Sequence, residues 1–212
     1  MKVSIVFLVL LFAITVSAAT AAVIDHTGNV TAGWNMLALA GIPLDPDPTA
    51  VFGSIPVDTK LYRLDAATQS MILYDVWTPD IFGNMLLTDG YWLLADAADS
   101  FTYSGLDDND SMDVWISLPV AGWTLMGNPF SYDYTWANAK VTDGNITVSM
   151  TDASRSQSWL SSIGYWFDNN TQSMLDIGIP DDYPSTEALP PWHGMWVQSN
   201  RDKIALIFES TL

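Results

Sequence analysis

The sequence predicts an all-β protein: an antiparallel β-sandwich or barrel built from two pseudo-symmetric repeats, with one or two short helices. Apolar, strand-like runs recur between turn residues at the spacing that is typical of sandwiches and barrels. No amphipathic helical pattern extends beyond about three turns. Only two of the 24 acidic residues are Glu, which leaves 24 − 2 = 22 Asp. Asp favours turns and is poor inside helices, so the composition agrees with many strands and many turns.

An internal repeat indicates the architecture. The order Tyr, Asp, Thr, Gln, Ser, Met occurs in 62–71 and again in 165–174, at an offset of 165 − 62 = 103 residues. The correspondence extends to two further pairs of tripeptides, Ala32-Gly33-Trp34 with Ala121-Gly122-Trp123 and Gly90-Tyr91-Trp92 with Gly194-Met195-Trp196. The chain therefore contains a duplicated unit, with repeats at about 30–105 and 119–209 joined by an acidic connector, 106–113.

In the first repeat, the run after Gly33 is a mostly buried strand. Prolines make 43–48 a loop, because Pro cannot donate a ladder hydrogen bond. Asp47-Pro48 has the N-cap and N1 pattern that begins a short helical turn through Phe52. Strands at 61–64 and 69–74 form a hairpin, 77–84 is a loop, and 90–94 and 101–103 are further strands.

The second repeat keeps this order after a strand at 114–118. The offset between repeats grows from 122 − 33 = 89 to 103, so about 103 − 89 = 14 residues are inserted between Phe130 and Tyr165. Within the insertion we expect a strand at 145–150 and a short helix at 152–160. One repeat alone would leave apolar strand faces open, so we expect 23–212 to form a single domain in which the repeats pack together.

The first 22 residues have the pattern of a secretory signal peptide: Lys2, an apolar run to Val16, and small residues from Ser17 to Ala22. The apolar run is shorter than the roughly 20 residues of a membrane-spanning helix. We therefore expect a secreted protein, extracellular or periplasmic, with no membrane insertion after cleavage. The chain has no Cys, which excludes disulfides, thiol catalysis and Cys-based zinc sites.

The formal net charge of −17 disfavours nucleic acids and anionic membranes as partners. An extracellular protein or a polysaccharide is compatible with this charge. Frequent turns explain the acidity, and calcium binding or a saline habitat are the alternative explanations.

The motifs Gly33-Trp34-Asn35-Met36-Leu37, Leu61-Tyr62-Arg63-Leu64-Asp65 and Gly90-Tyr91-Trp92-Leu93 resemble a recurrent β-module of exported bacterial surface and extracellular proteins. In such modules Gly-Trp-Asn-Leu and Gly-Tyr-Trp bracket a unit of about this length. The resemblance covers almost the whole mature chain, twice. It implies a module without established catalytic residues.

The ten Trp residues divide into two groups. The matched pairs Trp34/Trp123 and Trp92/Trp196 are predicted to pack inside the fold, because a buried indole contributes a large apolar area. Aromatic residues without a partner in the other repeat are the candidates for ligand binding: Trp77, Tyr132, Tyr134, Trp136 and Trp192. Trp159 is assigned to the apolar face of the inserted helix. We expect a binding surface where the second repeat departs most, from Tyr132 to Trp136 and on to Leu160, although Trp136 alternatively seals the core.

No catalytic constellation is predicted. Carboxylate pairs are too abundant to indicate a glycoside hydrolase, and the two His residues, His26 and His193, are expected to be structural or exposed. No cofactor is expected unless calcium binds. The connector offers weak calcium candidates, Asp107, Asn109 and Asp113, but it lacks the Gly and the final acid of an EF-hand loop. The sequence thus predicts a non-catalytic structural or interaction module, with a carbohydrate-binding module as the alternative and a glycoside hydrolase third.

Overall fold

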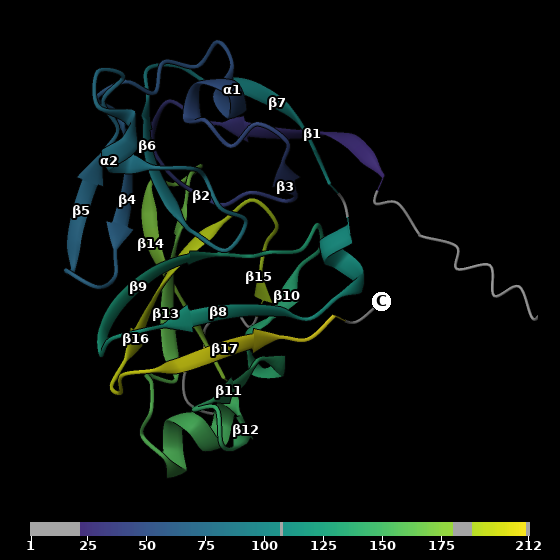
Figure 1. The fold of residues 1–212 in the computed structure, drawn as a ribbon, viewed down its shortest axis with the longest axis vertical. Helices are drawn as coiled ribbons and strands as arrows, with labels where there is room; N and C mark the ends of the chain where they lie inside the picture. Colours follow the sequence, from purple (N-terminus) through teal and green to yellow (C-terminus); the bar gives the residue numbers. More distant parts are fainter. Residues whose placement is uncertain (1–21, 107, 180–187, 211–212) are drawn as a thin grey trace, which may run out of the picture.

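The computed structural model describes residues 22–106, 108–179 and 188–210 and confirms the all-β prediction (Figure 1). Every strand pairing among these residues is antiparallel, and none of the five sheets that they form closes into a barrel. Residues 1–21 of the predicted signal peptide lie outside the described part.

The first half of the chain, 22–106, forms two sheets. One has the order β2 (Gly33–Leu37), β6 (Tyr91–Ala95), β4 (Leu61–Asp65), β5 (Ser70–Leu73). The other has the order β1 (Val23–Val30), β7 (Asp99–Leu106), β3 (Ile42–Pro43). Two short helices, α1 (Pro48–Phe52) and α2 (Pro79–Phe82), lie between strands.

The second half, 114–210, has the corresponding four-stranded sheet in the order β9 (Gly122–Gly127), β16 (Gly194–Ser199), β13 (Ile163–Asp168), β14 (Ser173–Gly178). Its other large sheet has the order β12 (Thr147–Ser149), β11 (Lys140–Thr142), β17 (Ile204–Phe208), β8 (Val114–Leu118). A small sheet pairs β10 (Tyr134–Thr135) with β15 (Ala188–Leu189). Short helical turns occur at η1 (Asp108–Ser111), η2 (Trp136–Asn138) and η3 (Asp152–Ser156).

Local signals in the sequence explain several of these elements. The Asp47 side chain accepts a hydrogen bond from the Thr49 amide at 2.8 Å, which confirms the predicted start of α1. The loop prediction for 43–48 is wrong at Pro43, because Pro43 ends the edge strand β3, where a missing amide donor is tolerated. The polar-looking segment that forms β1 was not predicted as a strand. It pairs along its whole length with β7, so tertiary pairing decides its structure.

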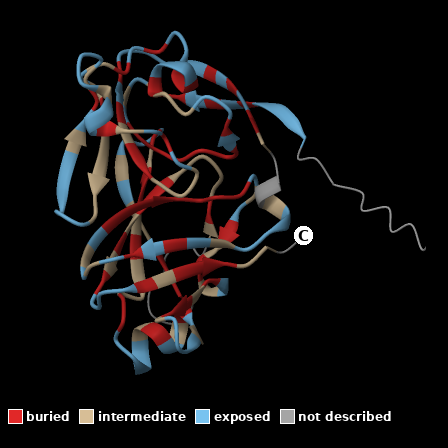
Figure 2. Cartoon of the chain, viewed as in Figure 1, coloured by how far each residue is buried: buried red, intermediate tan, exposed pale blue. Residues whose placement is uncertain are grey.

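Three apolar clusters hold the fold together (Figure 2). The largest lies in the second half, and a comparable one, including Leu61, Tyr91 and Leu93, lies in the first half. The third combines both halves: Met36, Leu125 and Phe167 are buried there, with Leu64, Trp92 and Trp196 packed around them. Because side chains alternate along a strand, the sheets β2-β6-β4-β5 and β9-β16-β13-β14 each turn one face to the core of their own half and the other to this shared cluster.

Corresponding main-chain contacts join the two halves. The Ala38 amide donates to the Trp192 carbonyl at 3.0 Å, and the Gly127 amide donates to the Thr88 carbonyl at 3.1 Å. The backbones approach so closely at the start of β16 that a Cβ atom on Gly194 would lie 3.0 Å from the Leu37 carbonyl oxygen. Glycine is therefore needed at this position for a steric reason, independently of its conformational freedom.

Candidate ligand-binding face

The surface above the shared cluster is lined by aromatic rings and methionines from both halves, and we call it the aromatic face. Each contributing residue of the first half has a counterpart in the second half at the position that the repeat assigns to it. The contributors are Trp34, Tyr62, Met71 and Trp92 from the first half, and Trp123, Tyr165, Met174 and Trp196 from the second. They lie on β2, β4, β5 and β6 and on β9, β13, β14 and β16.

The rings are arranged alike in the two halves. Trp34 and Trp92 meet edge to face, with ring centroids 5.9 Å apart and an interplanar angle of 90°. Trp123 and Trp196 meet at 6.3 Å and 88°. Tyr62 lies 5.9 Å from Trp34 at 53°, and Tyr165 lies 6.0 Å from Trp123 at 55°. Edge-to-face contact stabilises aromatic pairs, so the rings hold one another in place.

One glutamine from each hairpin connects that hairpin to the opposite half. The side-chain amide of Gln172 accepts from the Trp34 amide at 2.9 Å and donates to the Trp34 carbonyl at 2.8 Å. Gln69 makes the same two bonds to Trp123, at 2.7 and 2.9 Å. A Cβ atom on Gly33 would lie 2.6 Å from the Gln172 amide oxygen, and Gly33 has a φ of +99°. Glycine before Trp34 thus satisfies both a steric and a conformational requirement.

The turns that present these glutamines are also equivalent. Asp65 accepts from the Ala67 amide at 3.0 Å and from the Thr68 hydroxyl at 2.7 Å. Asp168 repeats both bonds with Asn170 and Thr171. In each turn the threonine hydroxyl is the largest influence on the carboxyl and lowers its pKa below the usual value of 3.8. Both carboxylates are therefore engaged in hydrogen bonds within their own turns.

The aromatic face contains two neighbouring cavities that share Met71 and Trp196. The first has a volume of about 370 Å³ and is lined by Trp34, Tyr62, Met71, Trp92, Phe167 and Trp196. The second has a volume of about 590 Å³, and Leu64, Gln69, Trp123, Tyr165 and Met174 complete its lining. Neither lining includes a charged residue. Such a surface can hold an apolar or aromatic group.

The structure corrects the prediction that Trp34 and Trp123 are buried. Their exposed fractions are 39% and 37%, so both indoles are open to solvent on the aromatic face. Trp92 and Trp196 are partly buried and pack against the shared cluster. The repeated positions therefore build both the contact between the halves and an accessible surface, a combination that the sequence argument did not consider.

The five aromatic candidates for ligand binding do not come together. Tyr134 and Trp136 are each only 1% exposed and pack in the core of the second half, where a ligand has no access to their rings. Tyr132 is stacked on Phe130 at 4.9 Å. Trp192 is packed against Phe101 at the core of the first half. Trp77 is 88% exposed, but it belongs to neither cavity of the aromatic face.

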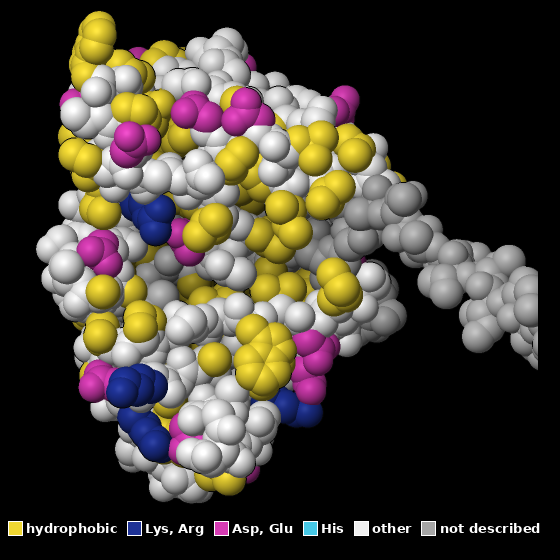
Figure 3. All heavy atoms as spheres, viewed as in Figure 1, with side chains coloured by type: hydrophobic (Ala, Val, Ile, Leu, Met, Phe, Trp, Pro, Cys, Tyr) yellow, Lys and Arg dark blue, Asp and Glu magenta, His cyan; other side chains and the backbone are white. Residues whose placement is uncertain are grey.

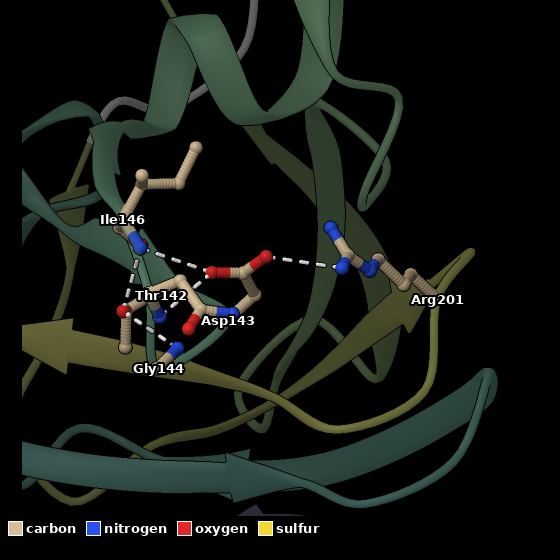
Figure 4. Close-up of polar contacts among 6 residues, drawn as sticks. Thr142, Asp143, Gly144, Ile146 and Arg201 are labelled. Carbon is tan, nitrogen blue, oxygen red and sulfur yellow. Dashed lines mark hydrogen bonds and ion pairs between the residues drawn. The ribbon is translucent and has the colours of Figure 1, made fainter.

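Within the insertion, the turn between β11 and β12 is fixed by hydrogen bonds of Asp143 (Figure 4). Asp143 accepts from the Asn145 and Ile146 amides, each at 3.0 Å, and its other oxygen accepts from Arg201 at 3.0 Å. The Arg201 guanidinium also lies 4.7 Å from the centroid of the Trp159 ring. The backbone bond from Ile146 is the main reason that the pKa of Asp143 lies below 3.8. This cluster anchors the β11–β12 hairpin to the β16–β17 turn.

The two histidines and Asp113 of the acidic connector contact other parts of the fold. His26 is buried and stacks on Tyr103 at 5.2 Å, and the His193 ring meets Trp166 edge to face at 5.1 Å. Asp113 accepts a hydrogen bond from the Ser210 amide at 3.1 Å. Asp107 and the Asn109 side chain lie outside the described part of the structure. Within the described ranges no group of three or more His, Asp or Glu side chains is arranged to hold a metal ion.

Sequence reasoning missed Tyr62, Tyr165, Met71 and Met174 as parts of a site. The available signal was the alternation of side chains along the strand: in β4, Tyr62 and Leu64 are on one face and Leu61 and Arg63 on the other. Met71 and Met174 stand at the same place in both repeats and are 44% and 45% exposed. A methionine kept twice at an exposed strand position is a marker of a surface with a role beyond packing.

Acidic side chains are scattered over the side of the molecule shown in Figure 3, and hydrophobic side chains are exposed between them. No family model, curated protein or solved structure matches the chain. The described residues include no helix that is long and apolar enough to cross a membrane.

Proposed function

We propose that this protein is an exported, non-catalytic interaction module that binds its ligand on the aromatic face. Export rests on the signal-peptide pattern of residues 1–22. The module would consist of two copies of one unit, and its motifs resemble the Gly-Trp-Asn-Leu and Gly-Tyr-Trp modules of exported bacterial surface proteins. The equal strand orders β2-β6-β4-β5 and β9-β16-β13-β14 support the two-copy interpretation.

The observation that carries the proposal is the exposure of matched tryptophans. Trp34 and Trp123 are 39% and 37% exposed, although each half has its own buried core. A contiguous patch of large apolar side chains in water marks an interaction site more often than a structural need. Because the patch occurs at corresponding positions in both halves, it is part of the unit and not an accident of one of them.

The composition of the cavities favours binding over catalysis. Their lining residues include no His, Asp, Glu or Lys, the side chains that most often serve as general acids and bases near neutral pH. Glycoside hydrolysis requires two carboxyl groups that flank the ligand. The acidic turn residues Asp65 and Asp168 are instead engaged with their own turn amides and threonines.

A carbohydrate-binding module is the second candidate, and the half-exposed indoles favour it because sugars stack on such rings. Sugar hydroxyls, however, also need hydrogen-bond partners. The polar side-chain groups of the second cavity are the Gln69 amide, the Tyr165 hydroxyl and the Trp123 and Trp196 indole N–H groups. The Gln69 amide already bonds to the Ala66 carbonyl and to both main-chain groups of Trp123. The aromatic face is therefore better suited to a ligand with few hydroxyl groups.

A thermal-shift screen tests the proposal. The mature protein and its Trp34→Ser/Trp123→Ser double variant are screened against soluble polysaccharides, oligosaccharides and small organic cations. We expect at least one class to raise the melting temperature of the wild-type protein only, and to be recovered chemically unchanged after long incubation. Ligands that shift both proteins equally, or that are consumed, would contradict a non-catalytic role for the aromatic face.

A further inference from the structure

The two halves of the aromatic face differ at one central position. Phe167 in the second half corresponds to Leu64 in the first, at the same offset of 167 − 64 = 103 residues. Both side chains belong to the shared cluster between the halves. The Phe167 ring contacts Trp92 at a centroid distance of 5.0 Å and an angle of 64°. The exchange of a ring for an aliphatic side chain thus makes the two cavities chemically different.

Five of the six side chains that line the first cavity are aromatic, and we call it the five-ring cavity. Its lining contains Trp34, Tyr62, Trp92, Phe167 and Trp196, whereas the second cavity has only Trp123, Tyr165 and Trp196 as rings. Trp34 is perpendicular to Trp92, and Trp92 is steeply inclined to Phe167. The rings that line this cavity therefore differ in orientation.

We propose that the five-ring cavity binds a quaternary ammonium group, the headgroup of a small organic cation. This inference rests on the proposed function, because it names the ligand class of the same face. The negative π-face of an aromatic ring attracts a cation within about 6 Å, and several rings act together when water is excluded. Tryptophan is the strongest such partner, and three of the five rings are tryptophans.

The lining of the five-ring cavity has few polar groups, and this favours a quaternary ammonium group over other cations. A primary ammonium or a metal ion would lose its water and find few oxygen ligands among the lining residues. A trimethylammonium group has no hydrogen-bond donor, so it can enter an apolar site without leaving a donor unsatisfied. The cavity volume of about 370 Å³ lies within the roughly 300–1,000 Å³ of small-molecule sites.

The charge of the protein also favours a cation. The formal net charge is −17, and no Lys or Arg lines the five-ring cavity. A negative field of this kind raises the local concentration of small cations and speeds their association. It acts over about 10 Å at 0.1 M ionic strength, so added salt is expected to weaken binding without abolishing it.

The experiment uses the mature protein labelled with ¹⁵N, in which each tryptophan gives a separate indole N–H signal. Choline is titrated in parallel with 3,3-dimethyl-1-butanol, a neutral molecule of nearly the same shape. We expect choline to shift the Trp34, Trp92 and Trp196 signals and to leave that of the buried Trp136 unchanged. The neutral molecule should bind about tenfold more weakly, a difference of about 1.4 kcal/mol that lies within the range of cation–π contacts.

Two exchanges at the differing position provide the matched test. Phe167→Leu gives the first cavity the residue of the second and should weaken choline binding about fivefold or more. Leu64→Phe adds a ring beside the second cavity and should make Trp123 respond to choline. Trp77→Ala, which removes an exposed tryptophan away from both cavities, should leave the affinity unchanged. The Trp136 signal reports whether each variant is folded.

The outcomes separate the two proposals. Equal binding of choline and the neutral molecule would overturn the quaternary ammonium assignment, while the aromatic face would remain a binding surface. Choline binding that is unaffected by Phe167→Leu in a folded protein would also overturn it. If neither compound nor any sugar of the screen moves an indole signal of the aromatic face, the proposed function itself fails.

Discussion

Gln69 in the first half holds the main chain of Trp123 in the second half through both of its side-chain amide atoms. Gln172 holds Trp34 in the same way, so each half fixes the exposed tryptophan of the other. The orientation of the aromatic face therefore depends on the contact between the halves. Neither Gln contributes to an apolar core, which makes the pair a clean test of this dependence.

Gln69→Ala and Gln172→Ala should each destabilise the protein by about 1 to 2 kcal/mol. Each change removes two hydrogen bonds to the opposite half, and the freed main-chain groups can bind water, which limits the cost. Urea denaturation of the single variants and of the double variant measures the effect. The two losses should be similar and nearly additive, since the glutamines occupy separate turns. A loss in only one variant would contradict the equivalence of the two contacts.

The tryptophans should differ according to their burial. Trp136→Ala should cost about 3 to 5 kcal/mol, as expected for truncation of a buried aromatic residue. Trp34→Ala and Trp123→Ala should each cost only about 1 to 2 kcal/mol, because part of each indole is already in contact with water. Thermal or chemical unfolding distinguishes these classes. An equally large loss at Trp34 would show that it belongs to the core.

The sequence predicted the strand content, the 61–74 hairpin and the start of α1. These features depend on local patterns: proline and aspartate at the start of α1, and alternating residues beside a turn at Asp65–Thr68. The aromatic face could not be predicted in this way. A matched tryptophan is equally consistent with a core and with a shared surface, and only the way in which the two sheets meet decides between them.

The inserted region illustrates the same limit. Its aromatic residues have no partner in the first repeat, which made them candidates for ligand binding. Tyr134 and Trp136 instead fill the core of the second half, which is the alternative stated above for Trp136. The larger core of that half requires side chains that the first repeat does not supply. Unmatched residues can therefore serve packing as readily as function, and burial depends on contacts that are distant in the sequence, such as Trp136 with Phe208.

His193 should make the protein sensitive to mild acid. Burial is the main cause that lowers the pKa of this imidazole below 6.5, and the ring donates to the Pro191 carbonyl at 2.9 Å. Because the unfolded chain takes up a proton at about pH 6.5 and the folded chain resists it, stability is full above this pH and falls as the pH decreases below it. Denaturation curves at pH 7.5 and 5.5 measure the change. His193→Gln should reduce the difference, and an unchanged difference would argue against His193 as its source.

Arg201→Ala should loosen the inserted hairpin while leaving the first half unchanged. The change removes the ion pair with Asp143 and the contact with the Trp159 ring. Amide hydrogen exchange should accelerate in β11 and β12 and stay constant in β4 and β5. Lys203→Gln, at an exposed position in the same turn, is the matched control for loss of one positive charge. Equal effects of both variants would assign the role to net charge instead of to the specific contacts.

The exposure of the aromatic face can be measured directly by oxidative footprinting of the free mature protein with hydroxyl radicals. We expect rapid oxidation of Trp34, Trp123, Met71 and Met174, because the exposed fractions of these residues are 37% to 45%. Trp136, Met36 and Met126 should be protected, since they are at most 1% exposed. Protection of Trp34 and Trp123 to the level of Trp136 would contradict the existence of an open aromatic face.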